Sequence, residues 1–204
     1  MLGNSYWAGQ GVKILAHEDA ASDFQDRGAD ILDSAQRRLN ERADQTVVSL
    51  PDETFTDRTD VSMGDMKIEV LYLGPAHSPG DIQVWLPDEQ LVIAGDIAFH
   101  ERLPPIFEET ESLGWIETWE NEFEGLGAVY IIPGHGHPTN LAQVRRYTRD
   151  YLVYLRGKIA ELLEDGGGLA EAYYVDQTPY EHLDTFEELA TRNAGRVFEQ
   201  MEFE

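Results

Sequence analysis

Three apolar segments of this chain each run directly into a turn that carries glycine together with a histidine or an aspartate. The segments have the pattern of strands and lie at residues 66–73, 91–94 and 128–132. The turns that follow them lie at residues 74–81, 95–96 and 133–138. Glycine permits a sharp backbone path, and in layered α/β proteins the loops at one edge of the sheet are where sites collect. The pattern therefore predicts a single site at a sheet edge.

Helical patterns surround these strands and predict the fold class. Apolar residues at helical spacing predict helices at residues 2–9, 17–39, 112–123, 141–162 and 186–201. In the second of these, Phe24, Ile31, Ala35 and Leu39 fall on one face. Further strands are predicted at residues 12–16 and 82–86, and one short strand at 46–63. Strands that alternate with helices indicate a mixed α/β layered domain, closed by helices.

The composition narrows the possible functions. The 204 residues include 39 acidic and 15 basic side chains, a formal net charge of -24. Such a charge repels phosphate backbones, so we expect no nucleic-acid partner. No segment approaches the roughly 18 apolar residues of a membrane-spanning helix, so we expect no membrane partner. The absence of cysteine excludes disulfides, iron–sulfur clusters and thiolate zinc sites. The compartment stays open, with the cytoplasm slightly favoured.

The candidate site residues are His77, Asp96 and His135, one from each turn. Two imidazoles and one carboxylate suit zinc or a similar divalent metal. A histidine in a Pro-Gly turn can also simply cap a loop, so the spacing alone leaves both interpretations open. No nucleophile motif of the G-x-S-x-G type and no phosphate-binding glycine motif competes with a metal site.

The stretches G-P-A-H-S-P-G-D, L-V-I-A-G-D and I-I-P-G-H-G-H-P, in this order, resemble the metallo-β-lactamase superfamily. The resemblance covers residues 1–138 and implies a partial αββα sandwich, with residues 139–204 as a helical extension packed on the same domain. It implies that His77 binds the first zinc, that Asp96 bridges both metals and that His135 binds the second. Asp96, in place of the cysteine of many true β-lactamases, is more similar to glyoxalase II-type hydrolases.

The family's signature, His-x-His-x-Asp-His, is missing from this sequence. His17 begins a predicted helix and has no histidine two residues away. The chain opens with Met-Leu-Gly-Asn, which is similar to the segment that follows the signature in family members. We therefore expect an N-terminally truncated hydrolase, whether through a misassigned start or a deliberate shortening. The missing strands would expose a sheet, which favours a homo-oligomer.

The resemblance implies a metal-dependent hydrolase of a small-molecule ester, thioester, lactone or amide. The catalytic group would be a metal-bound water held by Asp96. The intact family holds two zinc ions, whereas we expect this chain to hold at most one, weakly, and to be inactive or impaired. The alternative is a non-catalytic short form that acts as a binding or assembly module.

Three further residues adjoin the candidate ligands. Asp81 and His137 are candidates for orienting an imidazole, and ordinary hydrogen bonding within a turn is the alternative for both. His100 lies on a loop that borders the substrate cleft in the resembled family. It is a candidate for contact with substrate, and an ordinary place on the surface is the alternative.

Overall fold

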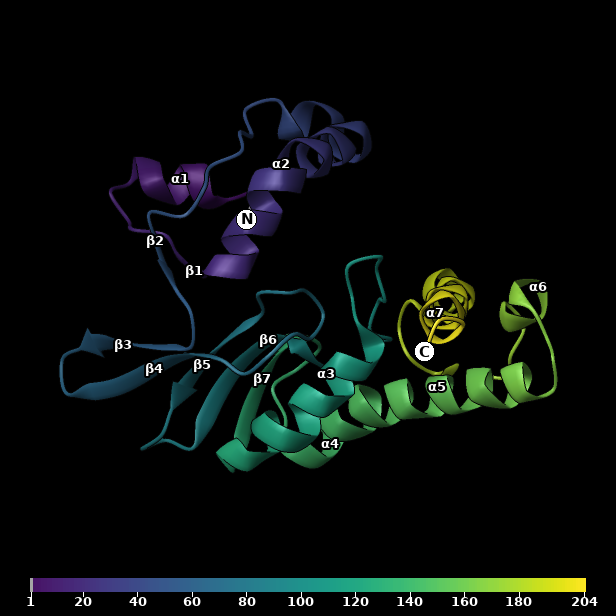
Figure 1. The fold of residues 1–204 in the computed structure, drawn as a ribbon. Helices are drawn as coiled ribbons and strands as arrows, with labels where there is room; N and C mark the ends of the chain where they lie inside the picture. Colours follow the sequence, from purple (N-terminus) through teal and green to yellow (C-terminus); the bar gives the residue numbers. More distant parts are fainter. Residues whose placement is uncertain (1) are drawn as a thin grey trace. The chain divides into compact units, whose positions relative to one another are not determined.

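The computed structural model describes residues 2–204 and divides at Thr59 into two compact units. The first unit contains five elements (Figure 1): α1 (Asn4–Gly9), β1 (Leu15–His17), α2 (Glu18–Leu39), the 3-10 helix η1 (Asn40–Ala43) and β2 (Glu53–Phe55). Strands β1 and β2 pair in parallel. The helices predicted at 2–9 and 17–39 are confirmed, whereas the strand predicted at 12–16 starts three residues later and ends one residue later.

Helix α2 begins at Glu18, one residue later than predicted, and His17 is its N-terminal capping residue. The Nδ1 of His17 accepts a hydrogen bond from the Asp19 backbone N–H at 3.2 Å, and its Nε2 lies 2.5 Å from the Thr56 carbonyl oxygen. The ring is therefore a buried helix cap. Of the residues predicted to share one face, Phe24 and Ala35 are buried, whereas Leu39 is 50% exposed. Leu39 is the last residue of the helix, where the chain turns away.

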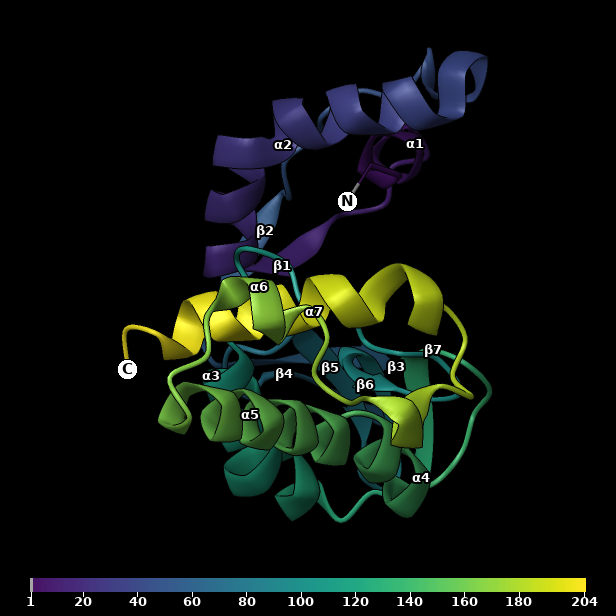
Figure 2. The same ribbon diagram turned by 90° about the vertical axis from the view of Figure 1, so that its right-hand side faces the viewer.

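The second unit is a sheet with helices packed against it (Figures 1 and 2). Its strands are β3 (Arg58–Met63), β4 (Met66–Tyr72), β5 (Ile82–Leu86), β6 (Leu91–Phe99) and β7 (Tyr130–His135), in that spatial order. Its helices are α3 (Ser112–Thr118), η2 (Trp119–Phe123), η3 (Glu124–Leu126), α4 (Leu141–Tyr147), α5 (Arg149–Glu164), α6 (Leu169–Ala172), η4 (Thr178–Tyr180) and α7 (Phe186–Met201). Helices and strands thus combine in an α/β fold, as predicted.

Strand β6 is longer than predicted. The sequence predicts that it ends at Ala94, before a turn, but the strand continues to Phe99. Gly95 has a φ of 62°, and the pairing with β7 shifts register on both sides of it. Gly95 is thus a bulge inside the strand rather than a turn after it, because glycine tolerates positive φ. Asp96 therefore lies on a rigid element.

The helix predicted at 141–162 is two helices, α4 and α5, separated at Thr148. The Thr148 hydroxyl accepts a hydrogen bond from the Phe99 N–H at 2.8 Å and lies 3.2 Å from the Phe99 carbonyl oxygen, to which it donates. This long-range pairing with the end of β6 accompanies the break, and the sequence pattern alone does not show it.

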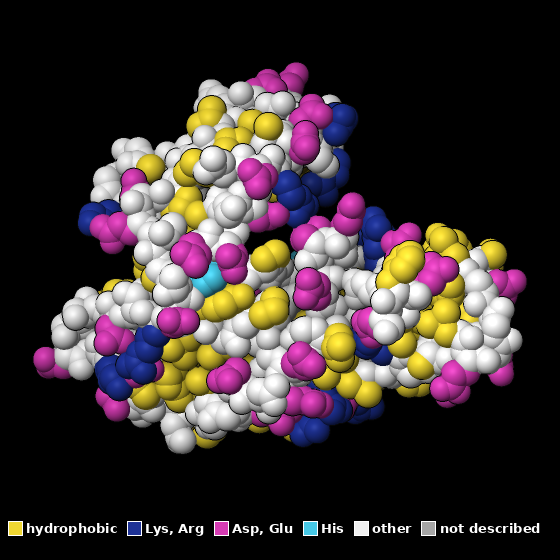
Figure 3. Space-filling model, viewed as in Figure 1, with side chains coloured by type: hydrophobic (Ala, Val, Ile, Leu, Met, Phe, Trp, Pro, Cys, Tyr) yellow, Lys and Arg dark blue, Asp and Glu magenta, His cyan; other side chains and the backbone are white. Residues whose placement is uncertain are grey.

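The two faces of the sheet differ. One face packs on the helices, and Val92 and Ile131 are fully buried there in one core with residues of α3, α5 and α7. The other face is apolar but open: Ile93 and Ile132, which are paired across β6 and β7, remain 42% and 36% exposed. Hydrophobic side chains gather over the strands in Figure 3, among scattered acidic groups. No helix in the described residues 2–204 is long and apolar enough to span a bilayer.

The helices after residue 138 lie in the same compact unit as the five-stranded sheet. Leu155 of α5 and Val197 of α7 belong to the same buried core as the strands. The domain boundary at residue 138 stays a prediction.

Candidate functional site

The structure brings His77, Asp96 and His135 together. His77 lies in the loop between β4 and β5, Asp96 lies within β6, and His135 is the last residue of β7. The Asp96 Oδ2 is 3.7 Å from the His77 Nε2, and the Asp96 Oδ1 is 3.8 Å from the His135 Nε2. One carboxylate thus faces an imidazole with each of its two oxygens.

A glycine makes this approach of β7 to Asp96 feasible. A Cβ atom on Gly134 would lie only 1.9 Å from the Asp96 Oδ1 and 2.8 Å from the Gly95 carbonyl group. Only a residue without a side chain fits there. The glycine of the Pro-Gly-His segment, predicted to make a turn, lies within β7 and is needed for the close approach of β7 to Asp96.

His77 is enclosed by aromatic rings. Its ring centre lies 5.2 Å from that of Phe107, 5.7 Å from that of Trp115 and 5.8 Å from that of Phe99. Its side chain is 12% exposed, and its Nδ1 is buried without a hydrogen-bond partner in the described residues. Thr110 fixes the loop by donating its hydroxyl hydrogen bond to the His77 carbonyl oxygen at 2.7 Å. His77 thus presents Nε2 to Asp96 and leaves an unsatisfied nitrogen on its other side.

His135 is more exposed, at 39%, and has a different set of contacts. Its ring stacks on Phe99 at 5.1 Å between centres, with 18° between the planes. The Arg102 Nη1 lies 3.3 Å from the His135 Nδ1. A guanidinium only donates hydrogen bonds, so Nδ1 accepts and the single ring proton of neutral His135 is on Nε2, facing Asp96.

Asp81 forms hydrogen bonds within its own turn. Its carboxylate accepts from the Ser78 backbone N–H at 2.9 Å and from the Ser78 hydroxyl. Burial raises the pKa of Asp81 above its ordinary value, while the bonds from Ser78 oppose that rise. The neighbouring His77 also lowers the pKa of Asp81, and the Asp96 carboxylate raises it. A role in orienting an imidazole stays a prediction.

His137 and His100 are linked to the loop around His135. The His137 Nδ1 lies 2.6 Å from a Glu101 carboxylate oxygen, and the hydrogen bond between them raises the pKa of His137 and lowers that of Glu101. The His100 Nδ1 lies 3.0 Å from the His137 carbonyl oxygen, and its ring packs 5.5 Å from that of Tyr147. These contacts are those of a surface loop; contact with substrate stays a prediction.

The donors fit a divalent metal in their chemistry but not in their number. The nitrogen and oxygen atoms of the two pairs are 3.7 and 3.8 Å apart. Two zinc–ligand bonds of about 2.0–2.1 Å can span these separations, so one ion can reach both atoms of either pair. Catalytic zinc, however, takes three protein ligands. Within residues 2–204, no three acidic or histidine side chains stand close enough together to hold one ion. The ring proton of His135 on Nε2 also opposes ligation there.

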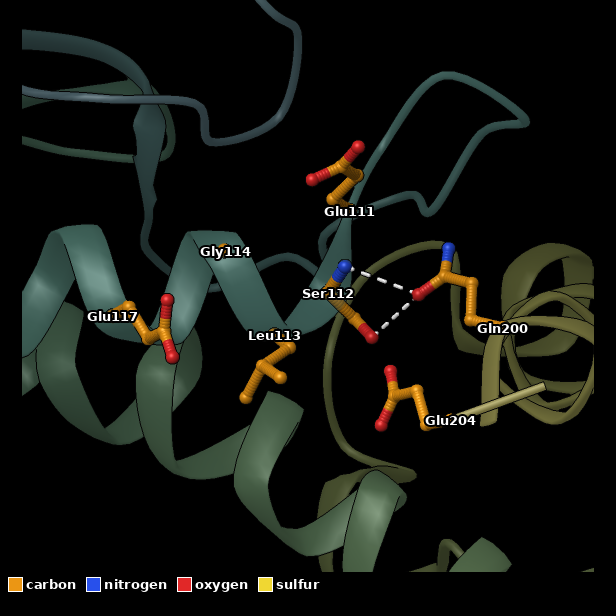
Figure 4. Close-up of a pocket in the computed structure, with 7 residues that line it drawn as sticks. All are labelled: Glu111, Ser112, Leu113, Gly114, Glu117, Gln200 and Glu204. Atoms are coloured by element: carbon orange, nitrogen blue, oxygen red, sulfur yellow. Dashed lines mark hydrogen bonds between the residues drawn. The ribbon is translucent and has the colours of Figure 1, made fainter. Parts of the chain in front are cut away.

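Among the concave regions of the second unit, one at the start of α3 and one along β7 lie outside this cluster. One is lined by Glu111, Ser112, Leu113, Gly114, Glu117, Gln200 and Glu204. Figure 4 shows Ser112 hydrogen-bonded to Gln200 on its wall. The other is apolar and lies along β7 and residues 138–140. Neither contains a residue predicted for the site.

Arg102 is the residue that the sequence analysis missed. In the loop that carries it, the sequence predicts a role for His100 alone. A lone arginine has no motif, and its position six residues after Asp96 is the one signal in the sequence. Its contact with His135 joins residues 33 positions apart and appears only in the fold.

The family model described as "Metallo-beta-lactamase superfamily" matches residues 8–135. Among curated relatives, a linear primary-alkylsulfatase of Pseudomonas sp. (strain ATCC 19151) is 23% identical over 125 residues, which cover 57% of this chain and 23% of the relative. A metallo-beta-lactamase type 2 of Bacteroides fragilis is 30% identical over 90 residues, which cover 43% of this chain and 36% of the relative. The chain thus spans well under half the length of these relatives.

Solved structures show a similar fold. A metallo-beta-lactamase family protein from Thermus thermophilus has a TM-score of 0.65 and 19% identity, and covers 98% of this chain and 70% of its own. A metallo-beta-lactamase from Pontibacter korlensis has a TM-score of 0.55 and 18% identity, and the match covers 74% of this chain and 62% of the Pontibacter chain. At such identities the likeness concerns the fold alone.

Proposed function

Since the chain belongs to the metallo-beta-lactamase superfamily, we propose that it carries part of the centre of a hydrolase, formed by His77, Asp96 and His135. The single observation that supports this most is the Asp96 carboxylate, whose two oxygens face one imidazole Nε2 each, at 3.7 and 3.8 Å. Members of the family are hydrolases, and the short distances between these three predicted residues support the proposal.

The proposal includes a divalent metal, zinc in the first place, with ligands drawn from His77, Asp96 and His135. Bound zinc supplies a Lewis acid in hydrolases. Three donors that do not converge on one point favour at most one weakly held ion in this chain, and hence low activity of the chain as it stands. Asp96 holds the two sides of the cluster together, and His77 provides the better-enclosed nitrogen.

The proposed substrate is a small ester, thioester, lactone or amide. An aspartate at position 96 favours glyoxalase II-type chemistry over that of a true β-lactamase. A primary alkyl sulfate is a second candidate, because the relative named as a linear primary-alkylsulfatase aligns over the largest share of this chain among the relatives given above.

The rival proposal is a non-catalytic binding or assembly module. The apolar face with Ile93 and Ile132 is exposed, and self-association through it is part of this proposal. Light scattering over a tenfold range of concentration tests it. We expect a mass that rises with concentration and that falls towards the monomer in the double variant Ile93→Thr/Ile132→Thr. A constant monomer mass would contradict self-association.

Zinc titration by calorimetry, followed by hydrolysis assays with zinc, tests the main proposal. The assays use thioester, lactone, β-lactam and primary alkyl sulfate substrates. We expect at most one weakly bound zinc per chain and slow turnover of one substrate class, both lost in the double variant His77→Gln/His135→Gln. Two tightly bound ions would contradict the partial site. Unchanged turnover in the double variant would contradict the proposed centre.

A further inference from the structure

One stripe of α7 lines a concave region that the candidate centre does not use. Its residues recur at helical spacing, and Tyr173, which directly follows α6, completes the lining. The region, called the α7 groove below, is lined by Tyr173, Arg192, Gly195, Arg196 and Glu199. Its volume is about 220 Å³, which leaves room for a small molecule. None of the residues predicted for the candidate centre belongs to it.

Arg192 contributes a positive charge without a carboxylate partner to the α7 groove. Its Cζ lies 5.2 Å from the centre of the Phe107 ring, a cation–π contact that holds the guanidinium without using its N–H groups. In the described part of the chain Arg192 forms no hydrogen bond or ion pair, although the protein has 39 acidic and only 15 basic side chains. A guanidinium has five N–H donors in a fork that matches an oxyanion, so all the donors of Arg192 are available for one.

Arg196, one helical turn after Arg192, is only partly compensated. Its Nη1 lies 2.9 Å from a Glu199 carboxylate oxygen, and its Nη2 lies 3.9 Å from one of Glu108. The Glu199 and Glu108 side chains are 48% and 86% exposed, and ion pairs this exposed are weak. Like charges four positions apart on a helix also repel each other. An anion between the two guanidinium groups would relieve that repulsion, and Glu199 is the group that competes with it for Arg196.

Tyr173 adds an aromatic wall, and Gly195 makes room for it. A Cβ atom on Gly195 would lie 2.5 Å from the Tyr173 Cε1 and 3.2 Å from its Cδ1, so a side chain at position 195 would have to displace the ring. The Tyr173 ring is 38% exposed, and its hydroxyl has no hydrogen-bond partner among residues 2–204. The α7 groove therefore combines an accessible aromatic surface and a free hydroxyl with two guanidinium groups.

We propose that the α7 groove binds a small tetrahedral oxyanion, phosphate or sulfate, either free or as the ester of an apolar group that packs on Tyr173. Because Arg192 and Arg196 come from successive turns, an anion whose oxygens point in several directions can contact both. The net charge of -24 repels anions at long range, so the short-range donors of the groove provide the binding. The site needs no metal and does not depend on the proposed function.

Anion titration of the 204-residue chain, followed by the chemical shifts of the arginine N–H groups and of the Gly195 amide, tests the site. Sodium phosphate, sodium sulfate and sodium acetate are compared with sodium chloride at equal ionic strength and pH. We expect saturable shifts with phosphate and sulfate and a weaker response to acetate. Arg192→Met should lower phosphate affinity by at least about tenfold, as expected for the loss of a charge-assisted hydrogen bond. Arg42→Met, which removes an exposed arginine of the first unit, should leave it unchanged.

Glu199→Gln provides a readout in the opposite direction, because it frees Arg196. We expect it to raise phosphate affinity by about two- to fivefold, the strength of an exposed ion pair, whereas Glu164→Gln on α5 should not.

Phenyl phosphate tests the aromatic wall. It should bind more tightly than inorganic phosphate, and Tyr173→Ala should remove that difference. Equal affinity of the two ligands for the unaltered chain would overturn the role of Tyr173. Responses to phosphate and sulfate no greater than the response to chloride, or phosphate affinity unchanged in Arg192→Met, would overturn the site. A preference for acetate would overturn its assignment to a tetrahedral anion.

Discussion

His77 and His135 flank the same carboxylate, yet their surroundings differ. His77 is enclosed by three aromatic rings and has an unsatisfied Nδ1, whereas His135 is half-exposed and its Nδ1 accepts from Arg102. A neutral histidine that ligates a metal needs one ring nitrogen free for the metal and its proton on the other ring nitrogen. His77 can adopt that state without moving a neighbour, and His135 cannot. The two sides of Asp96 are therefore unequal, and the His77 side is the more favourable one for a first ion.

The largest expected effect comes from Asp96, which the two sides share. Asp96→Asn removes the charge and one oxygen acceptor but keeps the shape. We expect zinc affinity to fall by at least about 100-fold, the upper range for loss of a partner that orients a ligand. Calorimetric titration measures this, with Asp88→Asn as a matched change at an exposed position. Zinc binding of unchanged affinity in Asp96→Asn would contradict this prediction, because the ion would then not depend on the carboxylate that His77 and His135 share.

The next largest effect is on stability, and it concerns the loop of residues 104–106, which follows Arg102, the neighbour of His135. Asn193→Ala leaves the Ile106 N–H and the Pro104 carbonyl group buried without partners. Each such loss costs about 1–3 kcal/mol, so we expect the free energy of unfolding to fall by about 3 kcal/mol. Urea unfolding followed by tryptophan fluorescence measures it, and Asn121→Ala on the exposed surface should change it by less than about 0.5 kcal/mol. An unchanged free energy of unfolding in Asn193→Ala would show that these hydrogen bonds do not stabilise the packing of residues 104–106 on α7.

The smallest expected effect is a difference in the free energy of unfolding between variants of His77 and of His135. His77→Phe replaces a ring whose Nδ1 is buried and unsatisfied, so we expect the metal-free protein to gain about 1 kcal/mol. His135→Phe should bring no gain, because its Nδ1 already accepts a hydrogen bond and its ring is partly in water. Urea unfolding in the presence of a chelator compares the two. Equal changes in both variants would show that the two environments are energetically alike.

Much of the fold could be predicted because local patterns are strong. Apolar periodicity locates α2, β5 and α7 within one residue or so, and Gly127, with a φ of 67°, ends the predicted helix that begins at Ser112. The break at Thr148 could not be predicted, since it goes with hydrogen bonds to Phe99, 49 positions earlier. Such a contact leaves no trace in the spacing of apolar residues.

For the site, the sequence by itself determined which side chains would be available: an imidazole or a carboxylate after each of three apolar segments, with glycine beside it. Apolar strand segments and glycine turns are local properties of the sequence, so this much is readable along the chain. Only the tertiary structure decided that Asp96 lies on a bulged strand between two imidazoles, and that Arg102 donates to His135. Those facts depend on how β6, β7 and their loops pack, and a hydrogen bond between residues 33 positions apart exists only once that packing is complete.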